Sequence, residues 1–243
     1  MCCLEGMKEI EDKSIDMILC DLPYGTTQNK WDSVIPLDKL WEQYNRIIKD
    51  NGAIALTANE PFQTAVINSN LKMFRYDLIW EKSHSVGFLN ARRMPMRKHE
   101  SILLFYKHLP TYIPQIEDKP TENIRPITIK DRLTSNYGKF DEGNHRTIPN
   151  DKTYPNSILR IPNESKTATK HPTQKPVALF EYLIKTYTNE NETVLDNCMG
   201  SGTTAIACIN TNRNYIGFEL DTSYFDIANE RVEQVKALWR YIT

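Results

Sequence analysis

Short apolar runs alternate along the chain with segments in which apolar residues recur every three to four positions. Runs of the first kind are typical of buried strands, and segments of the second kind are typical of helices that cover a sheet. Strands are expected at residues 16–20, 53–57, 76–80, 101–106, 193–195 and 215–218. Helices are expected at residues 37–49, 176–187, 203–210 and 222–239. This alternation predicts an α/β fold, with a mostly parallel sheet of the seven-stranded type and helices on both faces.

The pattern stops between residues 109 and 170, where prolines recur and neither period persists. A segment of this length without a regular pattern is too long for an ordinary connection, so it is either functional or mobile. We therefore expect one catalytic domain in three parts. Residues 1–108 form its first half, residues 109–170 form an insertion, and residues 171–243 form its second half.

The composition adds limits to this picture. Hydrophobic residues make up 40% of the 243 residues and charged residues 25%, which is typical of a globular domain. No apolar run is long enough for a membrane helix and no signal peptide opens the chain, so we expect a cytoplasmic protein that does not bind a membrane. The five cysteines form no CxxC pair, which favours reduced thiols and disfavours a metal site.

The charge is nearly balanced over the chain but not within it. A formal net charge of −1 argues against nonspecific coating of nucleic acid. Between Trp80 and His108, however, six Lys or Arg residues face only two acidic ones. This stretch is a candidate basic face.

Residues 194–205 are predicted to form a strand, a turn with two glycines and the start of a helix. Gly200 and Gly202 let backbone approach a ligand closely, and the following helix offers free N–H groups to an anion. The next expected strand ends at Glu219, whose carboxylate can accept hydrogen bonds from both hydroxyls of a ribose. The combination indicates a nucleoside cofactor, although the spacing of Gly200, Gly202 and Ala205 also fits the dinucleotide fingerprint.

The position of this motif constrains the topology. Only residues 220–243 follow Glu219, enough for one helix but not for the second half of a dinucleotide-binding fold. The rest of the sheet must come from upstream. We therefore predict a circularly permuted Rossmann-like fold, with the cofactor strand near the C-terminus and the catalytic strand near the N-terminus.

The first expected strand ends in Asp21-Leu22-Pro23-Tyr24, at the edge where open α/β sheets hold their ligands. By itself this tetrapeptide could be an aspartate-capped turn with a packed tyrosine. It also resembles the Asp-Pro-Pro-Tyr signature of the DNA amino-methyltransferases, and the order of the motifs resembles the beta class of that family. The resemblance covers essentially the whole chain and includes residues 171–176, 196–203 and 217–221.

The resemblance implies a methyltransferase fold, S-adenosyl-L-methionine as cofactor and double-stranded DNA as substrate. The Asp21 carboxylate and the Leu22 carbonyl would hold the hydrogens of the target amino group, while Pro23 stiffens the turn. Tyr24 would stack on a base flipped out of the duplex. A covalent step is not required, and the chain has no Pro-Cys dipeptide of the kind used by cytosine C5 methyltransferases.

The family motifs also mark the expected binding residues. The expected cofactor-binding residues are Asp21, Lys175, Asp196, Cys198, Gly200, Ser201, Gly202, Thr203, Glu219 and Leu220. The expected DNA-binding residues are Lys30, Arg92, Arg93, Arg97, Lys98, Arg125, Arg132 and Arg146. Phe62 is expected in the base pocket or in the core, and Glu100 is expected to be structural.

The sequence departs from the family pattern at two positions. Leu22 replaces the first proline of the tetrapeptide, a change that the turn should tolerate because this residue contributes its carbonyl. Cys2 stands where the family carries an aspartate that meets the cofactor adenine.

Several functions remain open at this point. Transfer of a methyl group to the N6 of adenine in DNA is favoured by Asp21, because enzymes that methylate the N4 of cytosine usually carry Ser there. Methylation of RNA or of a protein glutamine usually goes with Asn at this position. A nicotinamide oxidoreductase and an inactive DNA-binding module are the remaining alternatives. The family also allows a homodimer and a cognate restriction endonuclease as a separate protein.

Overall fold

The computed structural model describes residues 2–25, 33–121, 124, 148–163 and 174–242. The chain divides into two compact units, one made of Met1–Ile113 with Ser157–Thr243 and the other of Pro114–Asn156. The smaller unit contains the antiparallel pair β5 (Glu117–Asp118) and β6 (Lys152–Thr153), joined by an ion pair between Lys152 and Asp118. It lies within the predicted insertion, whose ends belong to the larger unit.

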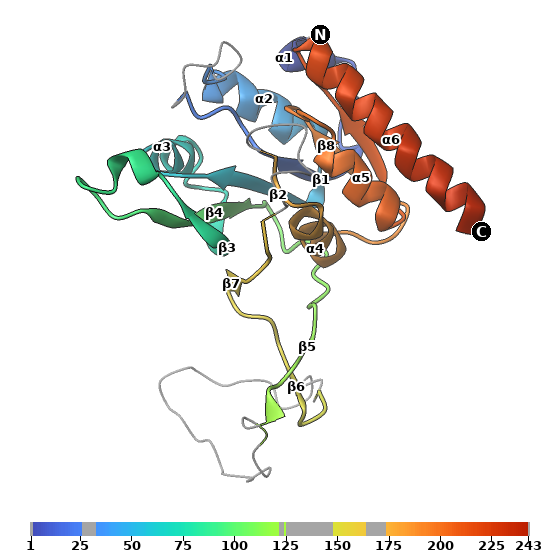
Figure 1. The fold of residues 1–243 in the computed structure, drawn as a ribbon. Helices are drawn as coiled ribbons and strands as arrows, with labels where there is room; N and C mark the ends of the chain where they lie inside the picture. Colours follow the sequence, from blue (N-terminus) through green and yellow to red (C-terminus); the bar gives the residue numbers. More distant parts are fainter. Residues whose placement is uncertain (1, 26–32, 122–123, 125–147, 164–173, 243) are drawn as a thin grey trace. The chain divides into compact units, whose positions relative to one another are not determined.

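The larger unit is built on one seven-stranded sheet (Figure 1). In spatial order the strands are β7 (Ile158–Leu159), β3 (Phe74–Val86), β4 (Arg97–Phe105), β2 (Ile48–Ala58), β1 (Ile15–Cys20), β8 (Thr193–Asp196) and β9 (Asn214–Gly217). β4 runs antiparallel to both of its neighbours, and the other pairs are parallel. The predicted mostly parallel sheet is confirmed.

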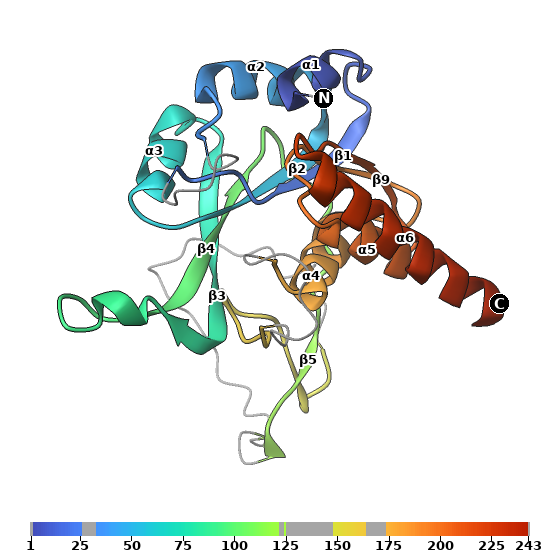
Figure 2. The same ribbon diagram turned by 45° about the horizontal axis from the view of Figure 1, so that its top comes forward.

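Helices cover both faces of this sheet. Side chains of alternate strand residues point to opposite faces, so Ile18 and Cys20 of β1 pack in one core layer and Met17 and Leu19 in the other. α1 (Cys3–Lys8), α2 (Leu37–Ile47) and α3 (Phe62–Ser69) cover the first face. α4 (Val177–Tyr187) and α5 (Thr203–Asn210) cover the second, and α6 (Thr222–Ile242) packs on α5 (Figure 2). Burial on both faces explains why these strands are continuous apolar runs.

The topology places a ligand site between β1 and β8. The chain moves from β1 through α2 to β2 on one side, and from β8 through α5 to β9 on the other. Two neighbouring parallel strands whose connections leave in opposite directions form a switch point, where open α/β sheets bind ligands. The N-terminal position of β1 and the C-terminal position of β8 confirm the predicted permuted order.

Some elements differ from the prediction. α1 and α3 were not expected, because neither short segment shows a clear apolar period. α5 also has eight residues, but the glycine turn before it marked where it begins. β3 continues beyond Trp80 to Val86 as a largely exposed strand that pairs with Arg97 of β4, and its polar residues hide it from an apolar pattern. Ile158 and Leu159 rejoin the sheet beside β3, although they belong to the segment predicted as an insertion.

Two features are absent from the described part of the chain. It contains no helix long and apolar enough to cross a membrane. Nor do its His, Cys, Asp and Glu side chains gather in a group of three or more that could hold a metal ion.

Candidate active site

A cavity of about 650 Å³ opens at the carboxyl edge of the parallel strands in the larger unit. Three segments far apart in the sequence contribute to its wall: the turn after β1, the turn after β8 and the end of β9. From these segments the lining residues are Asp21, Leu22, Pro23, Tyr24, Asp196, Cys198, Met199, Gly200, Ser201, Thr203, Glu219 and Leu220. The structure thus brings the predicted catalytic and cofactor residues onto one cavity. Gly202 lies behind the lining, against α6.

The turn after β1 is anchored through its aspartate and tyrosine. The Tyr24 hydroxyl lies 2.9 Å from Asp21 Oδ1, 3.0 Å from Thr57 Oγ1 and 2.7 Å from Glu100 Oε1. Burial, followed by the charges of Asp21 and Glu100, raises the pKa of Tyr24 well above its usual value. The Tyr24 ring stacks on Phe62, with 5.2 Å between the ring centroids. Tyr24 is therefore held by side chains of the protein where we expected it to stack on a base.

Lys175 joins the Asp21 carboxylate of this turn to the Glu100 carboxylate of β4. Its Nζ lies 2.6 Å from Asp21 Oδ2 and 3.1 Å from Glu100 Oε1. Burial lowers the pKa of Lys175, but the carboxylates of Asp21 and Glu100 outweigh it and raise the pKa above the usual value. Lys175 therefore stays charged and orients Asp21 toward the cavity.

Glu100 is a deeply buried acidic group of the site, with 3% of its side chain exposed. Its Oε2 lies 2.8 Å from Lys82 Nζ, so two ammonium groups face one carboxylate. Burial raises the pKa of Glu100, but Lys175 and Lys82 have the larger combined effect and lower the pKa to about 2. Glu100 was expected to be structural, yet it lines the cavity together with Lys82.

The direction of β4 explains why Glu100 was missed. Because β4 is antiparallel, its start lies at the edge where β1 and β2 end, as the pairing of Ser101 with Ala58 shows. A reading that assumes parallel strands places Glu100 at the opposite edge. The available signal was the charge itself, since Glu100 lies only one residue, Ser101, before the apolar run Ile102–Phe105.

The turn after β8 is shaped by Asp196 and two glycines in the left-handed region. Asp196 accepts hydrogen bonds from the Cys198 N–H at 3.0 Å and from the Thr204 hydroxyl, so it ties the turn to the start of α5. Burial raises the pKa of Asp196 to about 6. Gly202 has a φ of 84°, and a Cβ there would lie 3.0 Å from Ala228 of α6. Conformation and close packing therefore both favour glycine at this position.

Glu219 contacts the turn after β8, called the cofactor turn below, from the end of the neighbouring strand β9. Its Oε2 accepts a hydrogen bond from the Gly200 N–H at 2.7 Å, and its Oε1 accepts one from the Asp221 N–H at 2.9 Å. A carboxylate oxygen has two lone pairs, so each oxygen can accept one further hydrogen bond. Glu219 is partly exposed and lines the cavity, so its carboxylate is a candidate acceptor for a diol.

The remaining predicted cofactor residues hold the turn in place. The Ser201 hydroxyl lies 2.9 Å from Gln174 Oε1, and Arg231 of α6 donates to the Ser201 carbonyl at 2.6 Å. The Thr203 hydroxyl lies 3.4 Å from the Lys175 carbonyl. These contacts connect the cofactor turn to the residues that precede α4.

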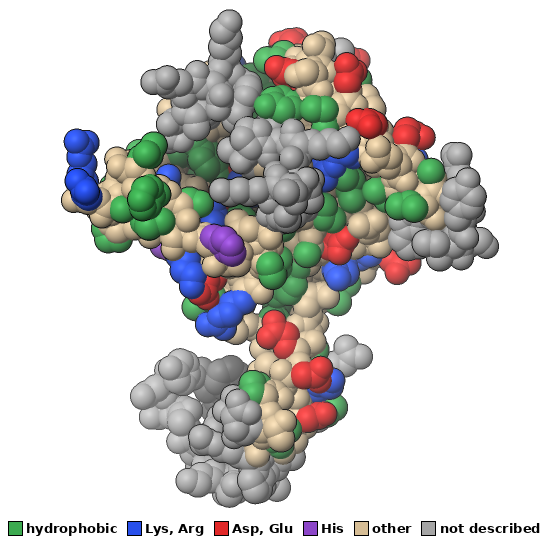
Figure 3. Space-filling model, in the orientation of Figure 1, with side chains coloured by type: hydrophobic (Ala, Val, Ile, Leu, Met, Phe, Trp, Pro, Cys, Tyr) green, Lys and Arg blue, Asp and Glu red, His purple; other side chains and the backbone are tan. Residues whose placement is uncertain are grey.

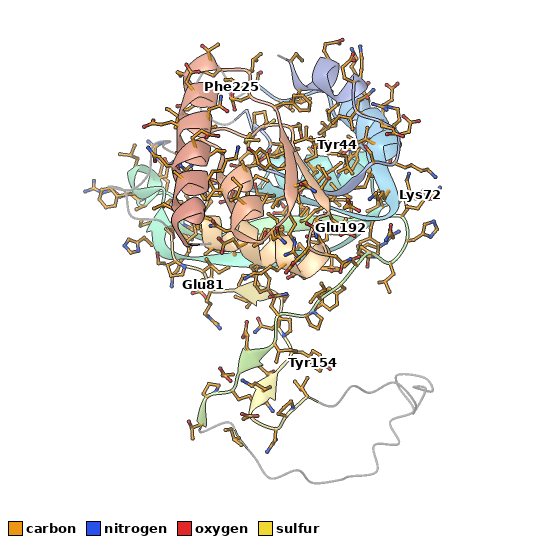
Figure 4. All side chains as sticks on the ribbon, turned by 90° about the vertical axis from the view of Figure 1, so that its right-hand side faces the viewer. Tyr44, Lys72, Glu81, Tyr154, Glu192 and Phe225 are labelled. Atoms are coloured by element: carbon orange, nitrogen blue, oxygen red, sulfur yellow. The ribbon has the colours of Figure 1, made fainter. Side chains whose placement is uncertain are left out.

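Three thiols lie beneath this turn. Asn197 Nδ2 lies 3.7 Å from Cys3 Sγ and 3.4 Å from Cys198 Sγ, and Tyr44 of α2 donates to the Asn197 side chain from the packed interior (Figure 4). A hydrogen bond from the Cys198 thiol lowers the pKa of Cys3 to about 6 despite burial. Burial raises the pKa of Cys20 to about 12. Neighbouring thiols therefore have very different pKa values, and Cys3, whose pKa is lowered, lines the cavity together with Cys2.

The predicted DNA-binding residues divide into two groups. Lys30, Arg125, Arg132 and Arg146 lie outside the described residues. Arg92 and Arg93 are exposed in the turn between β3 and β4, and Arg97 lines the cavity. Lys98 pairs with Glu81 at 3.1 Å, and Glu81 also pairs with Arg160 at 3.0 Å. DNA binding by these residues stays a prediction.

The permuted sheet and the cavity at its switch point define a Rossmann-like fold of the kind found in DNA methyltransferases. Solved structures share the fold: the M1.HpyAVI–SAM complex has a TM-score of 0.63 at 24% identity, covering 95% of this chain and 96% of that chain. The PvuII DNA methyltransferase, described as cytosine-N4-specific, has a TM-score of 0.66 at 16% identity, covering 98% and 89%.

The sequence places the chain in a family. The family described as "DNA methylase", the N6/N4 methyltransferases, matches residues 15–230, and the chain belongs to it. Similar curated proteins include the type II methyltransferase M1.MboII of Moraxella bovis, 28% identical over 97% of this chain and 96% of its own length. The DNA adenine methyltransferase YhdJ of Escherichia coli is 26% identical over 95% of this chain and 80% of its own length. The protein is a DNA amino-methyltransferase, and S-adenosyl-L-methionine is the methyl donor of the family.

Proposed function

We propose that this protein methylates the N6 amino group of adenine in double-stranded DNA. The observation that carries the proposal is the placement of Asp21 and Glu219 on one cavity, each at the carboxyl end of a parallel strand. The Glu219 carboxylate would hold a nucleoside, and the Asp21 carboxylate would accept hydrogen bonds from an amino group. An aspartate at position 21 favours adenine over cytosine.

The cavity fits the cofactor of the family. Glu219 offers two carboxylate oxygens to a ribose diol, while Gly200 and Gly202 allow the turn its left-handed backbone. Ser201 and Thr203 follow at the start of α5, beside Lys175, where the methionine end of the cofactor would lie. S-adenosyl-L-methionine supplies an electrophilic methyl group.

Asp21 would make the target amino group reactive. The nitrogen lone pair of an adenine amino group is delocalised into the ring, and acceptors for both hydrogens favour the geometry in which the lone pair can attack. Asp21 and the Leu22 carbonyl are the acceptors we assign to this role. The ion pair with Lys175 orients the Asp21 carboxylate, so that little reorganisation is needed when the base arrives.

Tyr24 must change its contacts when a base enters. Its hydroxyl now lies 2.9 Å from Asp21 Oδ1, which occupies part of the acceptor. Its ring stacks on Phe62, a contact that a base could replace at similar energy because both are flat π systems. We propose that Tyr24 stacks on the flipped base after giving up its bond to Asp21.

One experiment tests the proposed function. The purified protein is incubated with S-adenosyl-L-methionine carrying a labelled methyl group and with duplex DNA, and the modified nucleoside is identified after digestion. The proposal expects N6-methyladenine. N4-methylcytosine would support the alternative within the same family, and incorporation into RNA or protein but not DNA would contradict both.

We also propose that the insertion reads the DNA sequence. The cavity residues account for cofactor and chemistry, so specificity must come from elsewhere. Residues 109–170 carry Arg125, Arg132 and Arg146, donors suited to phosphates and guanine edges. Exchanging this segment for that of a relative with another site preference should change which sites are methylated, and an unchanged preference would refute the assignment.

A further inference from the structure

The turn between β3 and β4 exposes large apolar side chains. This hairpin tip, residues 87–96, contains the short 3-10 helix Phe88–Asn90. Leu89 is 97% exposed and Phe88 is 77% exposed, which makes them two of the most exposed large apolar residues in the described part of the chain. Removing such side chains from water is favourable, so their exposure next to each other points to a partner surface.

The backbone of the hairpin tip is ordered by its own hydrogen bonds. Gly87 adopts a left-handed conformation with φ of 93°, and its carbonyl accepts a bond from the Asn90 N–H at 3.0 Å. The Asn90 carbonyl accepts bonds from the N–H groups of Arg93, at 2.8 Å, and Met94, at 3.0 Å. Phe88 and Leu89 are therefore presented on a preformed turn, which lowers the entropy lost on binding.

The charge around these apolar residues suits a polyanion. Between Lys82 and His99 the sequence contains no Asp or Glu. Arg92 and Arg93 follow the 3-10 helix and are exposed. Figure 3 shows hydrophobic side chains next to Lys and Arg side chains at the left edge of the molecule, over this hairpin. A mixed apolar and basic tip fits nucleic acid, which has phosphates outside and stacked bases inside.

The hairpin tip also lies at the rim of the cavity. Val86 of β3 and Arg97 of β4 are paired with each other, and both line the cavity that contains Asp21 and Tyr24. The chain between these two residues is the tip, which projects from the sheet in both ribbon views (Figure 1, Figure 2). A base in the cavity would therefore leave its stack close to Phe88 and Leu89.

We infer that Phe88 and Leu89 form a wedge that enters the DNA duplex beside the target base and fills the space which that base leaves. Apolar side chains inserted between base steps partly unstack them, and they replace the lost stacking with apolar contact. Arg92 and Arg93 hold the flanking phosphates. This inference rests on the proposed function, because it needs a duplex substrate with a flipped base.

The experiment compares two duplexes that differ only in the pairing of the target base. Sequencing modified bases in cells that express the protein identifies the methylated site. Single-turnover methylation is then measured on that site, fully paired or with the target base mismatched. A mismatched base is easier to extrude, so a wedge matters less for it.

Leu89→Ala and Phe88→Ala should each slow methylation of the paired duplex by roughly tenfold or more. The same substitutions should slow methylation of the mismatched duplex much less. Their affinity for S-adenosyl-L-methionine should be unchanged. Leu71→Ala, at a leucine that is 65% exposed elsewhere in the larger unit, is the matched control and should behave like the unmodified protein. Arg92→Ala with Arg93→Ala should weaken binding of both duplexes equally.

Three results would overturn the inference. Equal losses on both duplexes, or no loss on either, would show that the tip is not a wedge while leaving the proposed function in place. A change in oligomeric state by sedimentation, with methylation of both duplexes unaltered, would assign the tip to a contact between copies of this chain. If the unmodified protein methylated no DNA, the proposed function would fail, and the wedge with it.

Discussion

Lys175 Nζ lies 2.6 Å from Asp21 Oδ2, which joins residues 154 positions apart in the sequence. Lys175 immediately precedes Pro176 and α4, whereas Asp21 follows β1, so this ion pair connects the C-terminal half of the domain to the turn after β1. Glu100 accepts from the same ammonium group at 3.1 Å. Removing one partner of a buried ion pair leaves the other charge uncompensated, so the three residues should behave as a unit.

The lowered pKa of Glu100 predicts a dependence of stability on pH. An acidic group whose pKa is lowered by folding stabilises the folded protein at every pH above its ordinary pKa, which is 4.5 for Glu100. This stabilisation is lost as the pH falls from 4.5 toward about 2. The contribution at neutral pH should be roughly 3 kcal/mol in the free energy of unfolding. Glu100→Gln should therefore be less stable than the unmodified protein at pH 7, with a difference that shrinks below pH 4.5.

Urea unfolding of both proteins between pH 7 and 3 measures this difference. Glu9→Gln, which removes the same charge from an exposed position, is the control and should stay within about 0.5 kcal/mol of the unmodified protein. A difference between Glu100→Gln and the unmodified protein that is independent of pH would show that Glu100 acts only through packing.

Glu219 should determine cofactor affinity. Glu219→Ala removes two charged acceptors and should weaken binding of S-adenosyl-L-methionine by about 2–3 kcal/mol, measured by calorimetry. Glu219→Gln keeps one acceptor oxygen, so its affinity should lie between those of the unmodified protein and Glu219→Ala. Because Glu219 also accepts from the Gly200 N–H, circular dichroism of both variants checks that the fold is intact. Unchanged affinity in Glu219→Ala would remove Glu219 from the cofactor site.

Tyr24 should act through its ring more than through its hydroxyl. Tyr24→Phe keeps the ring and loses the contacts with Asp21 and Glu100, so methylation should fall by less than about tenfold. Tyr24→Ala also loses stacking on the base and should fall by about tenfold to a hundredfold. Methylation rates under single-turnover conditions separate the two, and full activity of Tyr24→Ala would contradict the proposed base pocket.

Cys3, which is partly exposed, should be alkylated more readily than the buried thiols of Cys20 and Cys208. With a pKa of about 6 it is mostly thiolate at pH 7, whereas burial raises the pKa of Cys20 to about 12. The rate of labelling by iodoacetamide, followed on Cys3 by peptide mass spectrometry, should rise through pH 6 and then level off. A Cys2→Ser background removes the neighbouring exposed thiol. Since Cys3 lines the cavity, saturating S-adenosyl-L-methionine should slow its labelling. A labelling rate that is the same with and without the cofactor would place Cys3 outside the binding site.

Sequence patterns predicted the central strands and the order of the two halves, because these strands are buried on both faces and carry unbroken apolar runs. The exposed end of β3 carries no such run, and the hairpin that it forms could not be recognised. Contacts between distant segments were also hidden. The glycine turn and Glu219 were recognisable from spacing alone. The place of Glu100 at the cavity depended on the direction of β4. Lys175 was expected at the cofactor from the family motif, but its ion pair with Asp21 depended on how the two halves of the domain fold together.

The central claim is that Asp21 prepares an adenine amino group for methylation, and that this role outweighs the contribution to cofactor binding that the family motif also leads us to expect of Asp21. The most direct measurement compares the unmodified protein with Asp21→Asn and Asp21→Ala, determining N6-methyladenine formed in duplex DNA and affinity for S-adenosyl-L-methionine in the same preparations. The account predicts N6-methyladenine from the unmodified protein only, with cofactor affinity retained within about threefold in both variants. Substantial N6-methyladenine from either variant, or a different methylated base from the unmodified protein, would contradict it.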